Sequence, residues 1–306
     1  MDDAWPLLPF ADWRDTYATL HLWSQVVGKV RLMQSPWTNH SWHVTLYVTP
    51  RGLTTSAIPH GTRNFSIDFD FIDHRLIIET SDGSVRTLPL RPQSVADFYA
   101  AVMAALADLG VPVRIHTMPN EIPDAIPFEQ DRQHAAYDAP AVTRFWRALI
   151  QVDRVFKTFR ARFAGKCSPV HFFWGSFDLA VTRFSGRPAP PHPGGVPHMP
   201  DWVAREAYSR EVSSAGFWPG NASAPEAIFY SYAYPEPAGY RDVAVPPREA
   251  RFDQMLGEFV LPYEAVRTSA NPDETLLSFL QGTYDAAADC AHWDRAALET
   301  AVPRVA

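Results

Sequence analysis

Hydrophobic positions along the chain follow two spacings, and these spacings divide it into expected helices and strands. Over residues 15–33, Leu22, Val26 and Val30 recur at intervals of four, which predicts a helix that the Ser35-Pro36 pair ends. Alternation of apolar and polar residues predicts strands over 42–49 and 65–71, and the runs 76–80 and 85–90 are expected to form a hairpin. Asp82-Gly83 is a typical turn between the last two strands.

The first half closes with a second helix. Ser94 is an expected N-cap for a helix over residues 95–109, and Gly110 follows as its stop signal. Four prolines then interrupt a polar segment at residues 119–140. We expect this segment to be a connector that crosses between two halves on the surface.

The second half repeats this order of elements. The expected elements are a helix at 141–163, a strand at 172–184, a Pro/Gly loop at 186–200, a helix from Asp201 to Val212, strands at 228–234 and 259–266, and a last helix at 273–291. An offset of 133 residues aligns Ser35-Pro36 with Ser168-Pro169, Leu46 with Leu179, Val48 with Val181 and Thr49 with Thr182. The pattern predicts an internal duplication, with chance likeness of two α-plus-β halves as the alternative.

The expected fold class is therefore α+β, internally duplicated, with two halves that each hold an antiparallel sheet and flanking helices. Residues 1–118 form the first pseudo-repeat, 119–140 the Pro-rich connector and 141–306 the second pseudo-repeat. We expect the two pseudo-repeats to pack into one unit, because each half completes its core against the other.

Four strings in the chain resemble a known family. They are Thr19–Lys29, His171–Asp178, Gly216–Gly220 and Phe229–Tyr234. The chain is similar over nearly its whole length to an uncharacterised, mainly bacterial family that is catalogued only as a domain of unknown function. This resemblance implies no activity, cofactor or catalytic residue.

Composition narrows the classes of function. The formal charge is −7 and no run of basic residues occurs, so nucleic acid is not an expected partner. The N-terminal residues lack a signal peptide, and no apolar stretch is long enough for a membrane span. Cys167 and Cys290 are the only cysteines, and we expect both to be free thiols in a cytoplasmic protein. Oligomeric state cannot be predicted from these features.

Familiar catalytic and cofactor motifs are absent from the sequence. It has no Walker-type phosphate loop, Gly-x-Ser-x-Gly, His-Glu-x-x-His or Cys-x-x-Cys, and no Gly-x-Gly-x-x-Gly. We therefore expect no cofactor.

The most unusual polar residues lie between His171 and Arg187. If this segment were one strand, Asp178 would share a face with Trp174. A carboxylate in an apolar strand needs a partner. Asp178 can act on a ligand, or it can pair with Arg183 and be purely structural.

Tyr230, Tyr232 and Tyr234 alternate along an expected strand, so their hydroxyls point to one side. Such a stripe suits the wall of a ligand cleft, and it equally suits a half-buried sheet face. The candidate ligand-binding residues are His171, Trp174, Asp178, Arg183, Tyr230, Tyr232 and Tyr234.

Other polar groups favour structural interpretations. The stripe of His21, Gln25 and Lys29 on the first helix is typical of a solvated face, with projection into a cleft as the alternative. The remaining candidates lack a supporting pattern for metal binding or nucleophilic catalysis: His40 with His43, His192 with His198, Cys290 with His292, and Cys167 beside Lys166. Phe217-Trp218-Pro219 between two glycines is an expected loop tip, a lid or oligomer contact or else a core plug.

Three classes of function stay open. The first is a binding protein or enzyme that takes a small polar molecule in an aromatic and carboxylate-lined cleft of the second half. The second is a metal-dependent hydrolase that uses scattered His and acidic residues. The third is a non-catalytic interaction or scaffold protein. The sequence does not identify a catalytic residue or assign any metal ligand.

Overall fold

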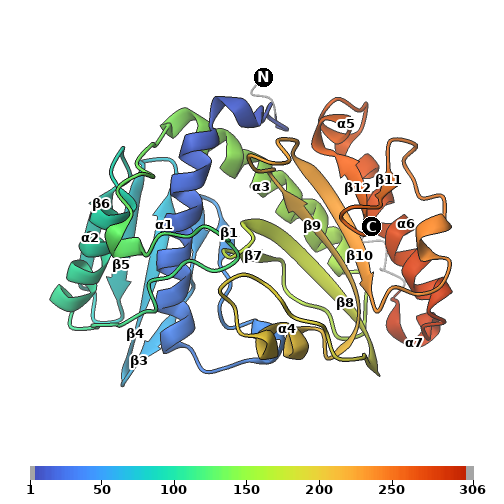
Figure 1. Cartoon of the computed structure of the whole chain (residues 1–306), viewed down its shortest axis with the longest axis horizontal. Coiled ribbons are helices and arrows are strands. Elements are labelled where there is room, and N and C mark those ends of the chain that lie inside the picture. Colours follow the sequence, from blue (N-terminus) through green and yellow to red (C-terminus); the bar gives the residue numbers. More distant parts are fainter. Residues whose placement is uncertain (1–3, 301–306) are drawn as a thin grey trace, which may run out of the picture.

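The computed structural model describes residues 4–300, which form two halves that lie side by side (Figure 1). The elements of the first half are α1 (Arg14–Gln34), β1 (Tyr47–Thr49), β2 (Gly52–Thr54), β3 (Ile58–His60), β4 (Arg63–Asp70), β5 (Arg75–Thr80), β6 (Val85–Pro89) and α2 (Val95–Asp108). The second half contains α3 (Ala139–Arg160), β7 (His171–Phe173), β8 (Asp178–Pro188), α4 (Asp201–Ala207), β9 (Arg210–Trp218), β10 (Ile228–Tyr234), β11 (Arg251–Asp253), β12 (Glu258–Pro262), α5 (Tyr263–Arg267), α6 (Pro272–Cys290) and α7 (Arg295–Leu298). Short 3₁₀ helices lie at Phe10–Asp12, Asn39–Ser41, Phe128–Gln130 and Tyr240–Asp242.

Each half contains one antiparallel six-stranded sheet. The first sheet has the order β1-β2-β4-β5-β6, with β3 paired to β4, and the second has the order β11-β12-β10-β9-β8-β7. The edges with β1 and β7 meet, because Leu46 and Phe172 exchange two backbone hydrogen bonds of 2.9 Å. The expected α+β class with an antiparallel sheet in each half is confirmed.

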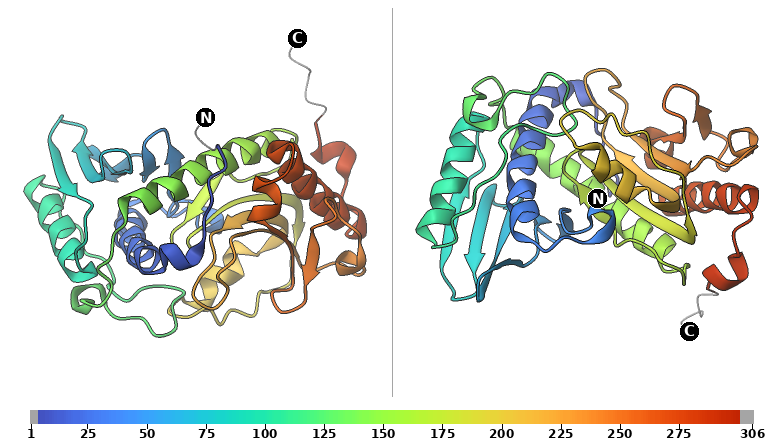
Figure 2. Two further views of the ribbon diagram at one scale, coloured as in Figure 1. Left: turned by 90° about the horizontal axis from the view of Figure 1, so that it is seen from above. Right: turned by 60° about the horizontal axis from the view of Figure 1, so that its bottom comes forward.

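Helices cover opposite sides of the two sheets (Figure 2). In the first half α1 and α2 lie together, and Trp23 of α1 stacks on Phe98 of α2 with ring centres 4.6 Å apart. In the second half α3 and α6 pack on one face of the sheet. The opposite face of the second sheet carries Asp178 and Tyr230, and Tyr208, directly after α4, and Glu121 of the connector lie near it.

Several sequence expectations hold for the elements. The helices predicted at 15–33, 95–109 and 273–291 are α1, α2 and α6, and Ser94 caps α2 by accepting a hydrogen bond from the backbone of Asp97. The hairpin at Asp82-Gly83 is present as β5 and β6. The strand at 228–234 is β10.

Other expectations are wrong in detail. The segment 172–184 is a hairpin, β7 and β8, joined by a turn at residues 174–177, and the expected strand at 42–49 is extended only from Tyr47 onward. The helix expected to Val212 ends at Ala207, because β9 begins at Arg210. Phe217 is a fully buried residue of β9, which agrees with the core-plug alternative, and the loop begins only at Pro219. Residues 263–267 form a short helix where the strand was expected to continue.

The connector is not a purely surface segment. Phe128, Asp131 and Tyr137 are all buried, and residues 118–121 lie against α1. A polar, proline-rich composition predicts irregular backbone, but it does not predict what that backbone packs against.

Each half has the order helix, antiparallel meander, helix, which agrees with a two-half layout. By strand order β1 corresponds to β7, whereas the offset of 133 pairs Leu46, beside β1, with Leu179 of β8. The order of elements therefore supports a duplication better than that residue alignment does. The boundaries at 119–140 stay a prediction.

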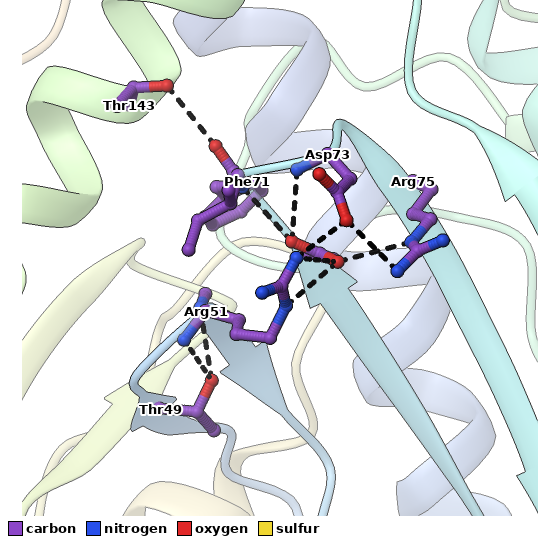
Figure 3. Close-up of polar contacts among 9 residues, drawn as sticks. Thr49, Arg51, Phe71, Asp73, Arg75 and Thr143 are labelled. Atoms are coloured by element: carbon purple, nitrogen blue, oxygen red, sulfur yellow. Dashed lines mark hydrogen bonds and ion pairs between the residues drawn. The ribbon is translucent and has the colours of Figure 1, made fainter.

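A buried carboxylate joins three segments of the first half at the end of the sheet (Figure 3). Asp70, at the end of β4, accepts hydrogen bonds from Arg51 at 2.8 and 3.0 Å and from Arg75 at 3.2 Å. Asp73 contacts the same two arginines at 2.7 and 3.0 Å, but it is half exposed. Burial raises the pKa of Asp70, and the hydrogen bonds from Arg51 and the neighbouring backbone outweigh burial, so the net pKa lies below its usual range.

Candidate functional site

Asp178 begins β8 and anchors the polar face of the second sheet. Its carboxylate is buried and accepts hydrogen bonds from the hydroxyls of Ser176 and Tyr230. Burial raises the pKa of Asp178 although both hydrogen bonds oppose the shift. Ser176 lies in the β7–β8 turn, where the buried Phe177 has φ +60°. A left-handed conformation at a non-glycine residue is costly, and such strain clusters at functional sites.

Tyr230 reaches Asp178 from two strands away. Strand β9 lies between β10 and β8, and Gly216 of β9 pairs with both Tyr230 and Ala180. The ring of Tyr230 lies over Gly216, where any Cβ atom would overlap the phenol. Glycine at position 216 therefore allows the tyrosine–carboxylate hydrogen bond.

We expect Gly216→Ala to push the phenol away from Asp178 and to lower the free energy of unfolding by about 1–3 kcal/mol through overpacking. Urea unfolding measures the loss. Tyr230→Ala makes room for the new methyl group, so adding Gly216→Ala to that variant is expected to change stability little. An equal loss in both backgrounds would show that the contact with Tyr230 is not the cause.

The tyrosine stripe extends this face. The hydroxyls of Tyr232 and Tyr208 are 2.7 Å apart, and the hydroxyl of Tyr234 donates to the Pro190 carbonyl at 3.1 Å. Burial raises the pKa of Tyr208 to about 12. All three stripe hydroxyls are thus hydrogen-bonded within the protein, and Tyr230 is the one joined to a carboxylate.

The polar stripe on α1 is buried and holds the connector, contrary to the solvated face that its spacing favoured. Lys29 donates to the Met118 carbonyl at 2.6 Å. Gln25 donates to the Asn120 carbonyl at 2.9 Å and accepts from the Asn120 amide at 2.8 Å. The His21 ring lies 2.8 Å from the Gly175 carbonyl, and burial lowers the pKa of His21 to about 4. The stripe therefore ties residues 118–120 and the β7–β8 turn to one helix.

Glu121 follows Asn120 in the chain, so the hydrogen bonds of Gln25 and Lys29 to residues 118–120 also fix the position of Glu121. Its backbone has φ +64°, and its amide donates to the Pro197 carbonyl at 2.8 Å. The carboxyl lies against Gly175, where a Cβ atom would overlap it. Burial raises the pKa of Glu121 to about 7, and the charge of Asp178 adds to the shift. Glu258, at the start of β12, has a pKa raised to about 7 by burial and then by Asp178 and Asp253.

A cavity of about 520 Å³ opens beside these groups, between the two halves. Glu121, Gly175 and Ser176 form its inner wall, and Tyr17 and His21 of α1 face them. The remaining lining comes from Phe10, Arg14, Ala18, Leu22, Ile122, Pro123, Asp124, Ala125, Ile126, Asp131, His134, Trp218, Asn221, Ala222 and Ser223. The cavity therefore adjoins Asp178 through Ser176, and it is shared with α1 rather than contained in the second half.

The structure brings together only part of the predicted set. His171 is fully buried at the edge where the sheets meet, 3.4 Å from the Tyr47 hydroxyl, and burial lowers its pKa to about 3. Trp174 donates to the Val44 carbonyl at 2.7 Å and packs over Gly28. Neither residue lines the cavity. The pattern of one continuous strand placed Trp174 on the same face as Asp178, and the turn at residues 174–177 separates the two.

Arg183 lies on the opposite face of β8. Its guanidinium lies 3.5 Å from the ring centre of Phe159 and 4.3 Å from that of Tyr284, and it donates to the Phe159 carbonyl. The proposed pairing of Asp178 with Arg183 is wrong, because residues five apart on a strand point to opposite faces.

The other candidates have separate surroundings. His192 stacks on Tyr208, whereas His198 lies 3.2 Å from the Pro123 carbonyl. Cys167 and Cys290 are unpaired, and burial raises the pKa of Cys167 to about 11. Within residues 4–300 no three or more His, Cys, Asp or Glu side chains are grouped to hold a metal ion.

Sequence reasoning missed Glu121 and Tyr17. Glu121 lies in the connector, for which the sequence predicts only irregular backbone. Gln25 and Lys29 hold it at the cavity through their hydrogen bonds to the residues before it. The available signal was the polar stripe itself, because a helix that buries Gln and Lys must pair them with something.

Fold and cavity define a two-sheet α+β protein with a carboxyl-lined pocket between its halves. A family model described as a family of unknown function, DUF5996, matches residues 5–300, so the chain belongs to that family. No curated protein and no solved structure matches the chain. Among the described residues, every helix is too short or too polar to cross a membrane.

Proposed function

We propose that the chain binds a small polar molecule in the cavity between α1 and the β7–β8 turn. The observation that carries this proposal is the position of Glu121, a desolvated carboxyl at the wall of a cavity of about 520 Å³, with no side-chain hydrogen bond to any residue of 4–300. Cavities of this size with aromatic walls and a few fixed polar groups are typical of small-molecule sites. Asp178, Tyr230 and Ser176 support the same wall from behind.

Strain and clamping support the proposal. Glu121 and Phe177 both occupy left-handed backbone conformations, and the contacts of Gln25 and Lys29 keep the connector in place. Such strain persists only where surrounding contacts over-determine the conformation. A preorganised site needs this arrangement, because ordering it at the moment of binding would weaken affinity.

Proton transfer is a second candidate function, and the Glu121 pKa of about 7 favours it. A general base works best when its pKa lies near the working pH. The metal-dependent hydrolase alternative has no comparable support, since the described residues offer no ligand set. A cytoplasmic location, the absence of nucleic-acid partners and the oligomeric state stay predictions or open questions.

The test is a ligand-observed NMR screen of small polar compounds against a cavity-filling variant. Ala18 lines the cavity on α1, so Ala18→Phe is expected to abolish binding. Ala104→Phe, on an exposed position of α2, is the matched control and should bind like the wild type. Binding that survives Ala18→Phe, or a screen in which nothing binds the wild type, would contradict the proposal.

A further inference from the structure

The carboxyl groups at the cavity and behind its wall have no cationic partner in the part of the chain that the structure describes. Glu121, Asp178 and Glu258 take part in no ion pair among the described residues, although Asp178 raises the pKa of both glutamates. The carboxylate of Asp178 accepts hydrogen bonds from two hydroxyls and from its own backbone amide, and these donors are all uncharged. Buried negative charges are ordinarily paired, because desolvation is costly without a compensating charge.

The cations nearest the cavity are engaged or uncharged. Arg14 lies 3.2 Å from Asp15 and is mostly exposed, and His134 lies 2.7 Å from the buried Asp131. His21 has a pKa of about 4, so it is neutral at pH 7. Glu121 and Asp124 also line the cavity, and neither forms an ion pair with a cation among residues 4–300.

Aromatic rings form the walls beside these carboxyls. Tyr17, Trp218 and Phe10 all line the cavity. Aromatic faces attract cations, and the attraction is larger where water is excluded. The same rings offer apolar area to the body of an organic ligand.

We propose that the ligand is an organic cation, a primary amine or guanidinium compound, whose charged head pairs with Glu121 and whose body packs against Tyr17 and Trp218. This inference rests on the proposed function and names its ligand class. The charge of Asp178, one hydrogen bond behind Ser176, strengthens the attraction. A bare metal cation does not fit, because the described residues lack three grouped ligands for it. An anion would meet the unpaired carboxyls and be repelled.

The experiment compares ligands of similar size and different charge by isothermal titration calorimetry at pH 8. The cations are phenethylamine and agmatine, the neutral analogue is phenethyl alcohol and the anion is 3-phenylpropionate. We expect at least one cation to bind, and to bind about tenfold or more tightly than the neutral and anionic probes. Glu121→Gln should remove about tenfold of that affinity, whereas Glu129→Gln, exposed in the same connector, should not.

The outcomes separate the two proposals. If a neutral or anionic probe binds better than both cations and loses binding in Ala18→Phe, the proposal of a cationic ligand is wrong. The proposal that the cavity binds a small polar molecule then still holds. No binding by any probe would overturn both. If Glu121→Gln proves unfolded by circular dichroism, Asp178→Asn replaces it, and unchanged cation affinity in that variant also overturns the inference.

Titration of the site gives a second readout. Asp178 and Tyr208 interact electrostatically with Glu121, and the other titratable groups that line the cavity are Arg14, Tyr17, His21, Asp124, Asp131 and His134. The pKa of Glu121 is raised to about 7, whereas that of His21 is lowered to about 4. Cation affinity should therefore rise severalfold from pH 6 to pH 8 in the wild type and less in Glu121→Gln. A cation affinity that is flat across this range would count against Glu121 as the pairing group.

Discussion

Asp70→Ala is expected to lower the free energy of unfolding by about 3 kcal/mol at pH 7, because it removes the buried carboxylate on which two half-exposed arginines and two backbone amides converge. Arg51 and Arg75 both donate to Asp70, and the amides of Ile72 and Asp73 donate to its other oxygen at 3.1 and 3.2 Å. The substitution leaves those backbone donors without their acceptor. Urea unfolding followed by circular dichroism measures the change.

Asp73→Ala is the matched control. Asp73 contacts the same two arginines, but its side chain is half exposed, and exposed ion pairs contribute about 0–1 kcal/mol. We expect Asp73→Ala to cost less than a third of what Asp70→Ala costs. Equal losses in the two variants would show that burial does not set the strength of this network.

The pH dependence of the Asp70 effect has a definite sign. The folded-state pKa of Asp70 is depressed, so its contribution is present above the unfolded pKa of about 3.8 and is lost as pH falls through the folded pKa. The difference between wild type and Asp70→Ala should therefore shrink in acid, below about pH 4. A difference that grew in acid would contradict the ion-pair explanation.

Glu121→Gln is expected to stabilise the protein in the absence of ligand, and to do so more at pH 8 than at pH 5. The folded pKa of Glu121 is raised to about 7, above the unfolded value of 4.5. The folded state thus binds the extra proton between these values, and stability falls as pH rises through about 7. Because Glu121 is partly exposed, we expect the change to be about 1–2 kcal/mol, below the full value of the shift.

The difference in stability between wild type and Glu121→Gln reports the titration of Glu121 alone. His21 and His171 have depressed pKa values of about 4 and 3, so both oppose the trend by adding stability as pH rises toward 6.5. They titrate alike in both proteins and cancel in the difference. Thermal unfolding of wild type, Glu121→Gln and Glu129→Gln at pH 5 and 8 makes the measurement. A stabilisation that is the same at both values would show that Glu121 is not desolvated.

A site residue that destabilises its own fold is informative about function. Replacing Glu121 is expected to help folding and to harm cation binding, so the two effects have opposite signs. For a purely structural carboxylate such as Asp70, we expect replacement only to lower stability. This contrast separates a ligand-binding role of Glu121 from a structural one.

Local pattern in the sequence determined the elements whose signals are contiguous. Helices α1, α2 and α6 follow from apolar residues at helical spacing, with Ser94 capping α2. The single-sided tyrosine stripe of β10 follows from the alternation of a strand. In each case the side chains that encode the element lie within it, so composition and period suffice.

Tertiary structure decided the site, because its groups come from segments that are distant in the chain. Whether Gln25 faces water or protein depends on the backbone of Asn120, and Tyr230 reaches Asp178 only because Gly216 lies between them. The turn that separates Trp174 from Asp178 places Phe177 at φ +60°, a conformation that its own side chain disfavours and its packing against Phe145 and Tyr17 supports. The periodicity of polar residues in the sequence predicts which side of a helix or strand is polar. What that side meets is set by long-range packing, and here it meets the connector that carries Glu121.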